Sequence, residues 1–190
     1  MGHQSLIDYI VRRFQQPGLL PLETHRLVAG LPVLRIITTN WDNLQEEALH
    51  MQSKPLVKVV EDHELAFFDS GKVLLVKLHG SVERPNSIVV TGDDYYDVFD
   101  RLPESSNLLR TLLATQTLLF LGFALADQDF RLLHHQVVRA MGRHKRRAYA
   151  IQRRPSRATR EYWLDKNVQV IAADVSDFLR AVHDQLALAP

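Results

Sequence analysis

Short apolar runs of strand length alternate along this chain with longer stretches that have helical spacing. The clearest run, residues 73–76, is apolar at every position, as in strands that are buried on both faces of a sheet. Strands that alternate with helices are typical of a parallel sheet with helices packed on its faces. The sequence therefore predicts an α/β fold, namely a Rossmann-like open parallel sheet flanked by helices.

The bounds of the expected elements follow from apolar periodicity and from the residues that end helices. Over residues 4–15 the apolar side chains recur at helical spacing, and Pro17 and Gly18 end that segment. We expect strands at residues 33–37, 56–60, 73–78, 117–121, 148–152 and 168–171. We expect helices at residues 4–15, 21–29, 42–50, 93–100, 104–114, 127–141, 157–164 and 175–186.

Length and residue types narrow the class of protein. The chain has 190 residues, which is enough for one domain with a sizeable core, and we expect a single domain over residues 1–190. Cysteine is absent, which excludes disulfides, thiolate nucleophiles and cysteine-based zinc sites. The longest nearly apolar stretch, residues 118–126, is about half of what a bilayer span needs, and the N-terminus lacks a secretory signal. We therefore expect a cytoplasmic protein with no membrane contact.

The charge balance gives no indication of a nucleic-acid partner. Lys and Arg total 23 against 22 Asp and Glu, so there is no global basic excess to attract a phosphate backbone. Residues 143–147 and 153–154 form the only dense charge cluster. We interpret this cluster as a solvated helix end and loop, with a phosphate-binding patch as the less favoured alternative. We expect no direct nucleic-acid binding.

Polar residues or glycine follow three of the expected strands at the point where each strand ends. Asn40 and Asp42 follow the first strand, His79 follows the fully apolar strand, and Gly122 follows the next. In an open parallel sheet, ligands bind at the carboxyl ends of the strands. Each residue alone has a structural interpretation: a turn or helix cap, a loop histidine, or a glycine that lets a helix approach. Their joint occurrence in this order favours a ligand site.

Four segments together form a recognisable set. They are residues 37–42 (Ile-Thr-Thr-Asn-Trp-Asp) with Leu44 and residues 46–48, residues 77–81 (Lys-Leu-His-Gly-Ser), residues 88–91 (Ile-Val-Val-Thr) with residues 94–96, and residues 119–127 (Leu-Phe-Leu-Gly-Phe-Ala-Leu-Ala-Asp). This set resembles the sirtuin-like NAD-consuming domains, specifically the bacterial branch that lacks the zinc module. Each motif alone is weak, but four in the same order make a fairly specific signal across residues 34–133.

The resemblance implies a role for each motif residue. In this family the bond between nicotinamide and ribose breaks through an oxocarbenium-like transition state, and an imidazole is a natural base near neutral pH. His79 matches the catalytic histidine, and Asn40 matches the asparagine that orients the ribose or the attacking water. Asp42 matches the acid that holds the nicotinamide carboxamide, and Gly122 matches the glycine at which backbone amides approach the nucleotide. The implied set is His79 and Asn40 as catalytic residues, and Thr39, Trp41 (as a pocket wall), Asp42, Gly122 and Phe123 as NAD-binding residues, with no metal.

The chain departs from the family pattern in two places. The family usually opens with a strand and a glycine-rich loop that cradles the pyrophosphate, but the only glycines before Asn40 are Gly2, Gly18 and Gly30, and none follows a strand pattern. We therefore expect an N-terminally incomplete fold, which leaves a fragment, a unit supplied by another subunit and a decayed domain as alternatives. Ala124 stands where the pattern often has serine, which removes a hydroxyl contact worth about 0.5–1.5 kcal/mol.

The resemblance favours an NAD-consuming hydrolase domain that releases nicotinamide and ADP-ribose in antiphage defence, with NAD as substrate and no zinc. Such a domain needs a trigger, which implies a fused or associated sensor protein and leaves a homo-oligomer open. An NAD-dependent protein deacylase is disfavoured because residues 81–121 contain neither cysteine nor histidine for a zinc ribbon. The non-enzymatic alternative is an inactive module that binds NAD or ADP-ribose; the missing loop supports it, and the joint presence of Asn40, Asp42 and His79 opposes it.

Overall fold

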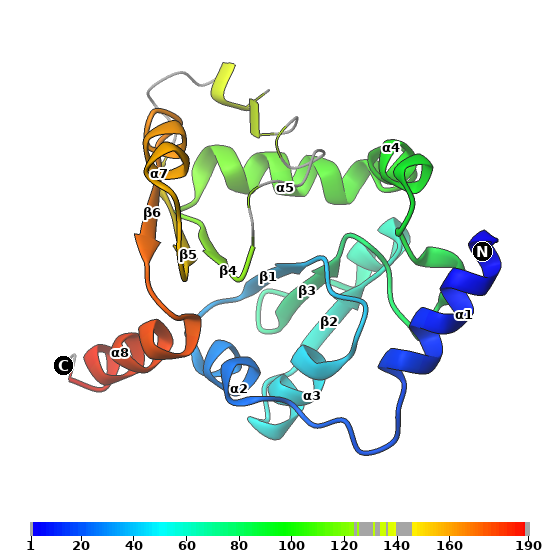
Figure 1. The fold of residues 1–190 in the computed structure, drawn as a ribbon. Helices are drawn as coiled ribbons and strands as arrows, with labels where there is room; N and C mark the ends of the chain where they lie inside the picture. Colours follow the sequence, from blue (N-terminus) through cyan, green and yellow to red (C-terminus); the bar gives the residue numbers. More distant parts are fainter. Residues whose placement is uncertain are drawn as a thin grey trace. The chain divides into compact units, whose positions relative to one another are not determined.

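The computed structural model describes residues 2–123, 125, 131, 134–135, 137–139 and 146–188, without the side chains of residues 93, 95, 96 and 99. The chain divides into two compact units, Met1–Ser105 (unit 1) and Ser106–Pro190 (unit 2). Each unit contains a three-stranded parallel sheet flanked by helices, so the α/β fold with open parallel sheets is confirmed (Figure 1). The single domain expected over residues 1–190 stays a prediction.

Unit 1 is organised around the sheet β1-β3-β2. Its elements are α1 (His3–Phe14), α2 (Glu23–Gly30), β1 (Arg35–Thr38), α3 (Leu44–Met51), β2 (Leu56–Val59), the 3₁₀ helix η1 (Asp62–Phe67), β3 (Val73–Lys77), the 3₁₀ helix η2 (Pro85–Ser87) and α4 (Gly92–Arg101). Helix α5 (Pro103–Thr115) begins at the end of this unit and continues into unit 2.

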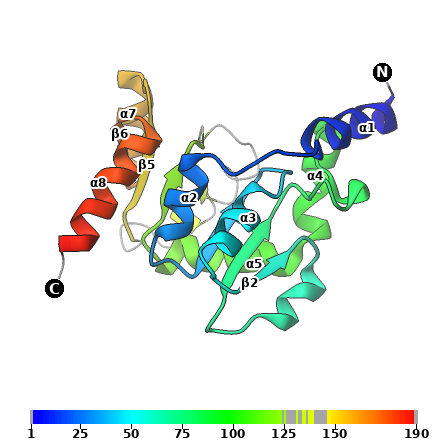
Figure 2. The same cartoon turned by 90° about the horizontal axis from the view of Figure 1, so that it is seen from below.

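Strand β3 is the centre of unit 1. It pairs in parallel with β1 on one side and β2 on the other, and all five of its residues are buried. The apolar run at residues 73–76 is thus confirmed as a strand that is covered on both faces. Helices α2 and α3 lie side by side in both views and pack Ala29, Ala48 and Leu49 against Val73 (Figures 1 and 2).

Unit 2 contains the sheet β4-β5-β6, with β5 in the centre. Its described elements are β4 (Leu119–Leu121), β5 (Ala148–Gln152), α7 (Arg157–Leu164), β6 (Val168–Ala172) and α8 (Val175–Leu188). Ala150, Ile151 and Val168 of the strands are buried, together with Trp163 of α7 and Leu179 of α8. The helices therefore cover the sheet with their apolar sides.

The sequence predicted the strands well, and the corrections are local. The first strand runs over Arg35–Thr38 rather than residues 33–37, and Val33 and Leu34 before it are exposed. The two 3₁₀ helices were not predicted, because such short helices carry too little apolar periodicity to be recognised. The helix expected at residues 127–141 lies largely outside the described residues. Within the described part of the chain, no helix has the length and apolar character to cross a bilayer.

Candidate functional site

The carboxyl ends of β1 and β3 lie level at one edge of the unit 1 sheet. Thr38 and Lys77 are register partners, and the N–H of Leu78 donates to the Thr38 carbonyl at 3.0 Å, which extends the ladder by one bond. Asn40 lies two residues beyond Thr38, and His79 lies two residues beyond Lys77. The structure therefore brings the loops that carry Asn40 and His79 to the same edge, where a parallel sheet binds ligands.

Residues 39–43, which we call the Asn40 loop, join β1 to α3. The main-chain N–H of Asn40 donates to Thr38 Oγ1 at 3.0 Å, so the Thr38 hydroxyl makes the turn and the exposed Asn40 carboxamide takes no part in this bond. Asp42 Oδ1 accepts a hydrogen bond from the N–H of Leu44 at 3.0 Å, at the start of α3. Asp42 thus makes an Asx turn just before α3, but it does not cap the helix as expected, because the N-cap residue is Asn43 and has no side-chain capping bond.

Trp41 attaches the Asn40 loop to the N-terminal helix. Its ring lies edge-on to Phe14, with centroids 5.9 Å apart, and packs against a buried cluster that includes Ile10, Val82 and Ile88. The indole Nε1 is buried and has no hydrogen-bond partner among the residues that the structure describes. This position makes Trp41 part of the packing between α1 and the loop, and its role as a wall of the nicotinamide pocket stays a prediction.

His79 lies in a turn whose backbone geometry is strongly constrained. The side chain is buried, and the His79 carbonyl accepts from the N–H of Val89 at 3.0 Å. Gly80 has φ +84°, and a Cβ at this position would lie 2.1 Å from the carbonyl oxygen of Ser87. Only glycine fits such a position, so the residue after His79 fixes the path of the backbone at the sheet edge.

Two residues of the site were missed by the sequence analysis, namely Lys77 and Glu46. Lys77 ends β3 and its side chain is fully buried, yet its Nζ donates to Glu46 Oε1 at 3.0 Å, to the Trp41 carbonyl at 3.3 Å and to the Asp42 carbonyl. Glu46 lies in the first turn of α3 and is also buried. A lysine at the end of an otherwise apolar strand was the available signal, although nothing local identifies its partners.

A second polar network anchors the segment after His79. Asn43 Nδ2 donates to Glu83 Oε1 at 2.7 Å, and Ser81 Oγ lies 3.4 Å from Asn43 Oδ1. The hydrogen bond from Lys58 holds the pKa of the Glu83 carboxyl below its ordinary value despite partial burial, and the charge of Lys77 adds to this effect. The Asn40 loop is therefore connected to the segment after β3 by side chains as well as by the sheet.

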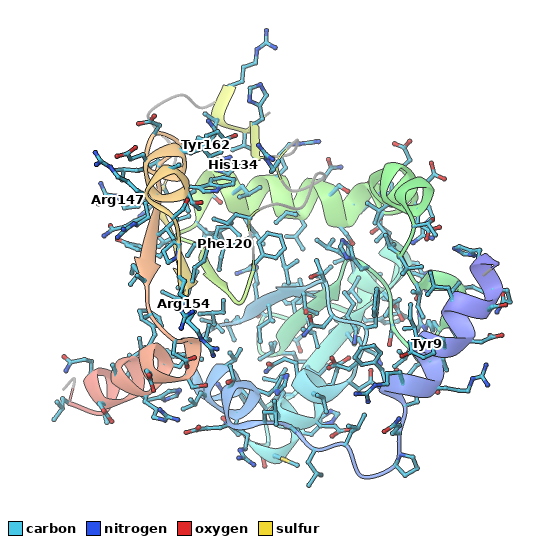
Figure 3. The ribbon with its side chains drawn as sticks, in the orientation of Figure 1. Tyr9, Phe120, His134, Arg147, Arg154 and Tyr162 are labelled. Atoms are coloured by element: carbon cyan, nitrogen blue, oxygen red, sulfur yellow. The ribbon has the colours of Figure 1, made fainter. Side chains whose placement is uncertain are left out.

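Unit 2 carries the remaining residues that the resemblance assigned to NAD. Gly122 follows β4 with φ +63°, and a Cβ there would meet no atom of the described residues within 4 Å, so the requirement for glycine is conformational. The Phe123 carbonyl accepts from Gln152 Nε2 at 3.4 Å, and the Phe123 ring stacks on Phe120 (labelled in Figure 3) with centroids 6.0 Å apart. Ala124 lies outside the described residues.

The described residues of the charge cluster, 146–147 and 153–154, lie at the two ends of β5. Arg146 and Arg147 precede the strand, Arg153 and Arg154 follow it, and all four are exposed (Arg147 and Arg154 are labelled in Figure 3). Arg153 donates to Asp174 Oδ2 at 2.6 Å. The exposure of these four arginines and the ion pair of Arg153 are compatible with a solvated surface. Residues 143–145 are not among the described ones.

Unit 1 also contains a cleft of about 710 Å³ at the end of β2. It is lined by Val60, Glu61, Asp62, His63, Arg84, Pro85, Asn86, Ser87, Arg101 and Leu102. Burial raises the pKa of the Glu64 carboxyl beside it, but the hydrogen bonds from Arg84 and from the main chain outweigh this and leave the pKa below its ordinary value. Arg84 of this cleft is thus paired with Glu64, and its guanidinium also lies 3.6 Å from Glu61 Oε1. In the described ranges, no group of three His, Cys, Asp or Glu side chains is placed to hold a metal ion.

Comparison with known proteins adds an independent line of evidence. A family model described as "SIR2-like domain" matches residues 34–171. The chain is 27% identical over 176 residues to "Defense-associated sirtuin 2" of Bacillus subtilis, a match that covers 90% of this chain and 17% of that protein.

Two further relatives are each named "NAD(+) hydrolase ThsA". The protein of Cytobacillus dafuensis is 29% identical over 157 residues, covering 82% of this chain and 32% of that protein. The protein of Bacillus cereus (strain MSX-D12) is 31% identical over 163 residues, covering 82% and 34%. The chain thus spans between 17% and 34% of the length of these curated relatives.

Proposed function

Because the chain belongs to the SIR2-like domain family, we propose that it is an NAD-consuming hydrolase domain that cleaves the bond between nicotinamide and ribose. The observation that carries this proposal is the placement of Asn40 and His79 at one sheet edge, each two residues beyond the register pair Thr38 and Lys77. The names of the ThsA relatives support NAD as the substrate.

The chemistry requires little more than these two side chains. The electron pair of the C–N bond leaves with nicotinamide, the ribose carbon becomes oxocarbenium-like, and water attacks that carbon to give ADP-ribose and a proton. His79 accepts the proton from the water or from a ribose hydroxyl, as an imidazole can near neutral pH. The Asn40 carboxamide, which its own turn bond leaves exposed, orients the ribose or the water.

We also assign to NAD binding the remaining residues that the resemblance implies. Asp42 accepts a hydrogen bond from the nicotinamide carboxamide, beside Trp41, and Thr39 contributes to the same part of the site. Gly122 and Phe123 present backbone amides to the nucleotide, which suits the positive φ of Gly122 and its lack of a side chain. Zinc has no part in this reaction, and a homo-oligomer is compatible with it.

We infer a role in antiphage defence from the relative named "Defense-associated sirtuin 2". NAD loss would be harmful to the cell that carries out such a reaction continuously, so the domain needs a trigger. We place that trigger in a fused or associated sensor protein, and the protein in the cytoplasm, where NAD is abundant. The longer relatives support this arrangement, because the match leaves most of each relative's length outside it.

The test is NAD cleavage by the purified chain, with nicotinamide and ADP-ribose separated by chromatography. We expect cleavage by the wild type and at least a hundredfold loss in His79→Gln and Asn40→Ala, while His50→Ala, an exposed histidine on α3, keeps full activity. Retained turnover in His79→Gln at wild-type melting temperature would exclude the assigned base. NAD binding without turnover would identify an inactive binding module, and nicotinamide release only with an acetylated peptide would identify a deacylase.

A further inference from the structure

The buried ammonium of Lys77 forms hydrogen bonds with the backbone of the Asn40 loop. Its three N–H donors match three acceptors: Glu46 Oε1 at 3.0 Å, the Trp41 carbonyl at 3.3 Å and the Asp42 carbonyl. We propose that Lys77 is a positioning residue, which holds the Asn40 loop at the distance from His79 that the reaction needs. This inference deepens the proposed function and rests on it.

The pair of Lys77 and Glu46 has no evident purpose in stability. Removing two charges from water is expensive, and a buried ion pair of this kind is often no better than well-packed apolar residues of the same volume. Lys77 is 0% exposed, and Glu46 keeps one oxygen, Oε2, buried without a partner among the described residues. An apolar residue would therefore suit the end of an apolar central strand at least as well.

An apolar residue would not donate hydrogen bonds to the loop. The two carbonyls that Lys77 binds belong to the residues directly after Asn40, and the Trp41 carbonyl also accepts from the N–H of Val82 at 3.0 Å. Lys77 is itself covalently two residues from His79, whose turn is fixed by Gly80. Lys77 thus connects the end of β3, two residues before His79, to the backbone of the Asn40 loop by direct hydrogen bonds.

The experiment separates stability from positioning with two variants. Lys77→Met leaves Glu46 buried and unpaired, so it loses stability for a trivial reason. Lys77→Met/Glu46→Leu removes both charges and keeps the volume, and we expect its melting temperature to return close to that of the wild type. The control is Lys54→Met, which removes another lysine-to-carbonyl hydrogen bond of unit 1, from Nζ to Leu31 O at 2.7 Å, between two residues outside the Asn40 loop.

We expect the double variant to lose about 10- to 100-fold in kcat with little change in KM, because a displacement of reacting groups by about 1 Å costs that much. Lys54→Met should keep the wild-type kcat. Recovery of kcat together with stability in the double variant would overturn the proposal, because it would show that the pair contributes only to the fold.

A second measurement does not depend on turnover. Hydrogen exchange followed by mass spectrometry should show faster exchange over residues 39–44 and at Val82 in the double variant than in the wild type or Lys54→Met. If the wild type does not cleave NAD, the proposed function fails, and the exchange rates still decide whether Lys77 holds the loop. Unchanged exchange in the double variant would overturn the positioning role, whatever the activity.

Discussion

Gly80 and Gly18 provide a matched pair for measuring how tightly the His79 turn is packed. Both glycines lie in unit 1 and both have φ +84°, a conformation that costs a residue with a Cβ about 1–2 kcal/mol. Their surroundings differ. A Cβ at Gly18 would meet nothing within 4 Å in the described part of the chain, whereas a Cβ at Gly80 would lie 2.1 Å from the Ser87 carbonyl oxygen.

The structure predicts different costs for the two alanine variants. Gly18→Ala should lose only the conformational term, about 1–2 kcal/mol in the free energy of unfolding. Gly80→Ala should lose that term plus about 1–3 kcal/mol for forcing the Ser87 backbone aside, a total of about 2–5 kcal/mol. The entropy that alanine removes from the unfolded chain is the same in both variants and cancels in the comparison.

Urea unfolding followed by circular dichroism measures this difference directly. For a chain of this size a loss of 1 kcal/mol lowers the melting temperature by about 2–4 °C, so Gly80→Ala should melt about 4–20 °C below the wild type. The packing argument is refuted if the two variants lose the same free energy, because the clash at Ser87 is the only difference that the structure predicts between them. A change in the urea slope would instead indicate that the unfolded state is altered.

Two further predictions concern other hydrogen bonds of unit 1. Asn40→Ala should change the free energy of unfolding by less than about 0.5 kcal/mol, because the main-chain N–H of residue 40, which makes the turn bond, remains. Thr38→Val removes the acceptor of this bond and should lose about 1 kcal/mol. Equal losses of the two variants in urea unfolding would contradict this assignment of the turn bond. Burial raises the pKa of the Asp94 carboxyl, but hydrogen bonds from the main chain of Thr91 and Val90 bring it to about 2 from an ordinary 3.8. Because folding lowers this pKa, ionised Asp94 stabilises the fold at pH values above 3.8, and Asp94→Asn should lose up to about 2 kcal/mol in the free energy of unfolding at neutral pH. The difference in free energy between variant and wild type should vanish as the pH falls from about 4 to about 2. A difference that stays constant over this range would refute the linkage.

The parts of the fold that the sequence predicted are those encoded by local pattern. An all-apolar run identified β3 as a buried central strand, and the ends of β1 and β3 could be assigned to one edge because parallel strands share their direction. Lys77 could not be assigned, since its partners are main-chain carbonyls 35 and 36 residues earlier in the chain. The contact of Trp41 with Phe14 is equally non-local, and the pattern around Trp41 gave no indication of it.

Asn40, and Lys77 at the end of β3, carry side chains that the fold itself does not require. Asn40 uses its main chain for its turn and exposes its carboxamide, so other small polar residues would serve the turn as well. The buried Lys77 donates hydrogen bonds to the backbone of the Asn40 loop, although an apolar residue would suit its place in the core. If stability alone determined these positions, neither residue would be expected. Finding Asn40 on this loop and Lys77 bonded to the loop backbone, two residues before His79, favours chemistry over scaffolding. The inactive binding module is therefore best tested at Asn40, where loss of turnover without loss of stability would identify an active hydrolase.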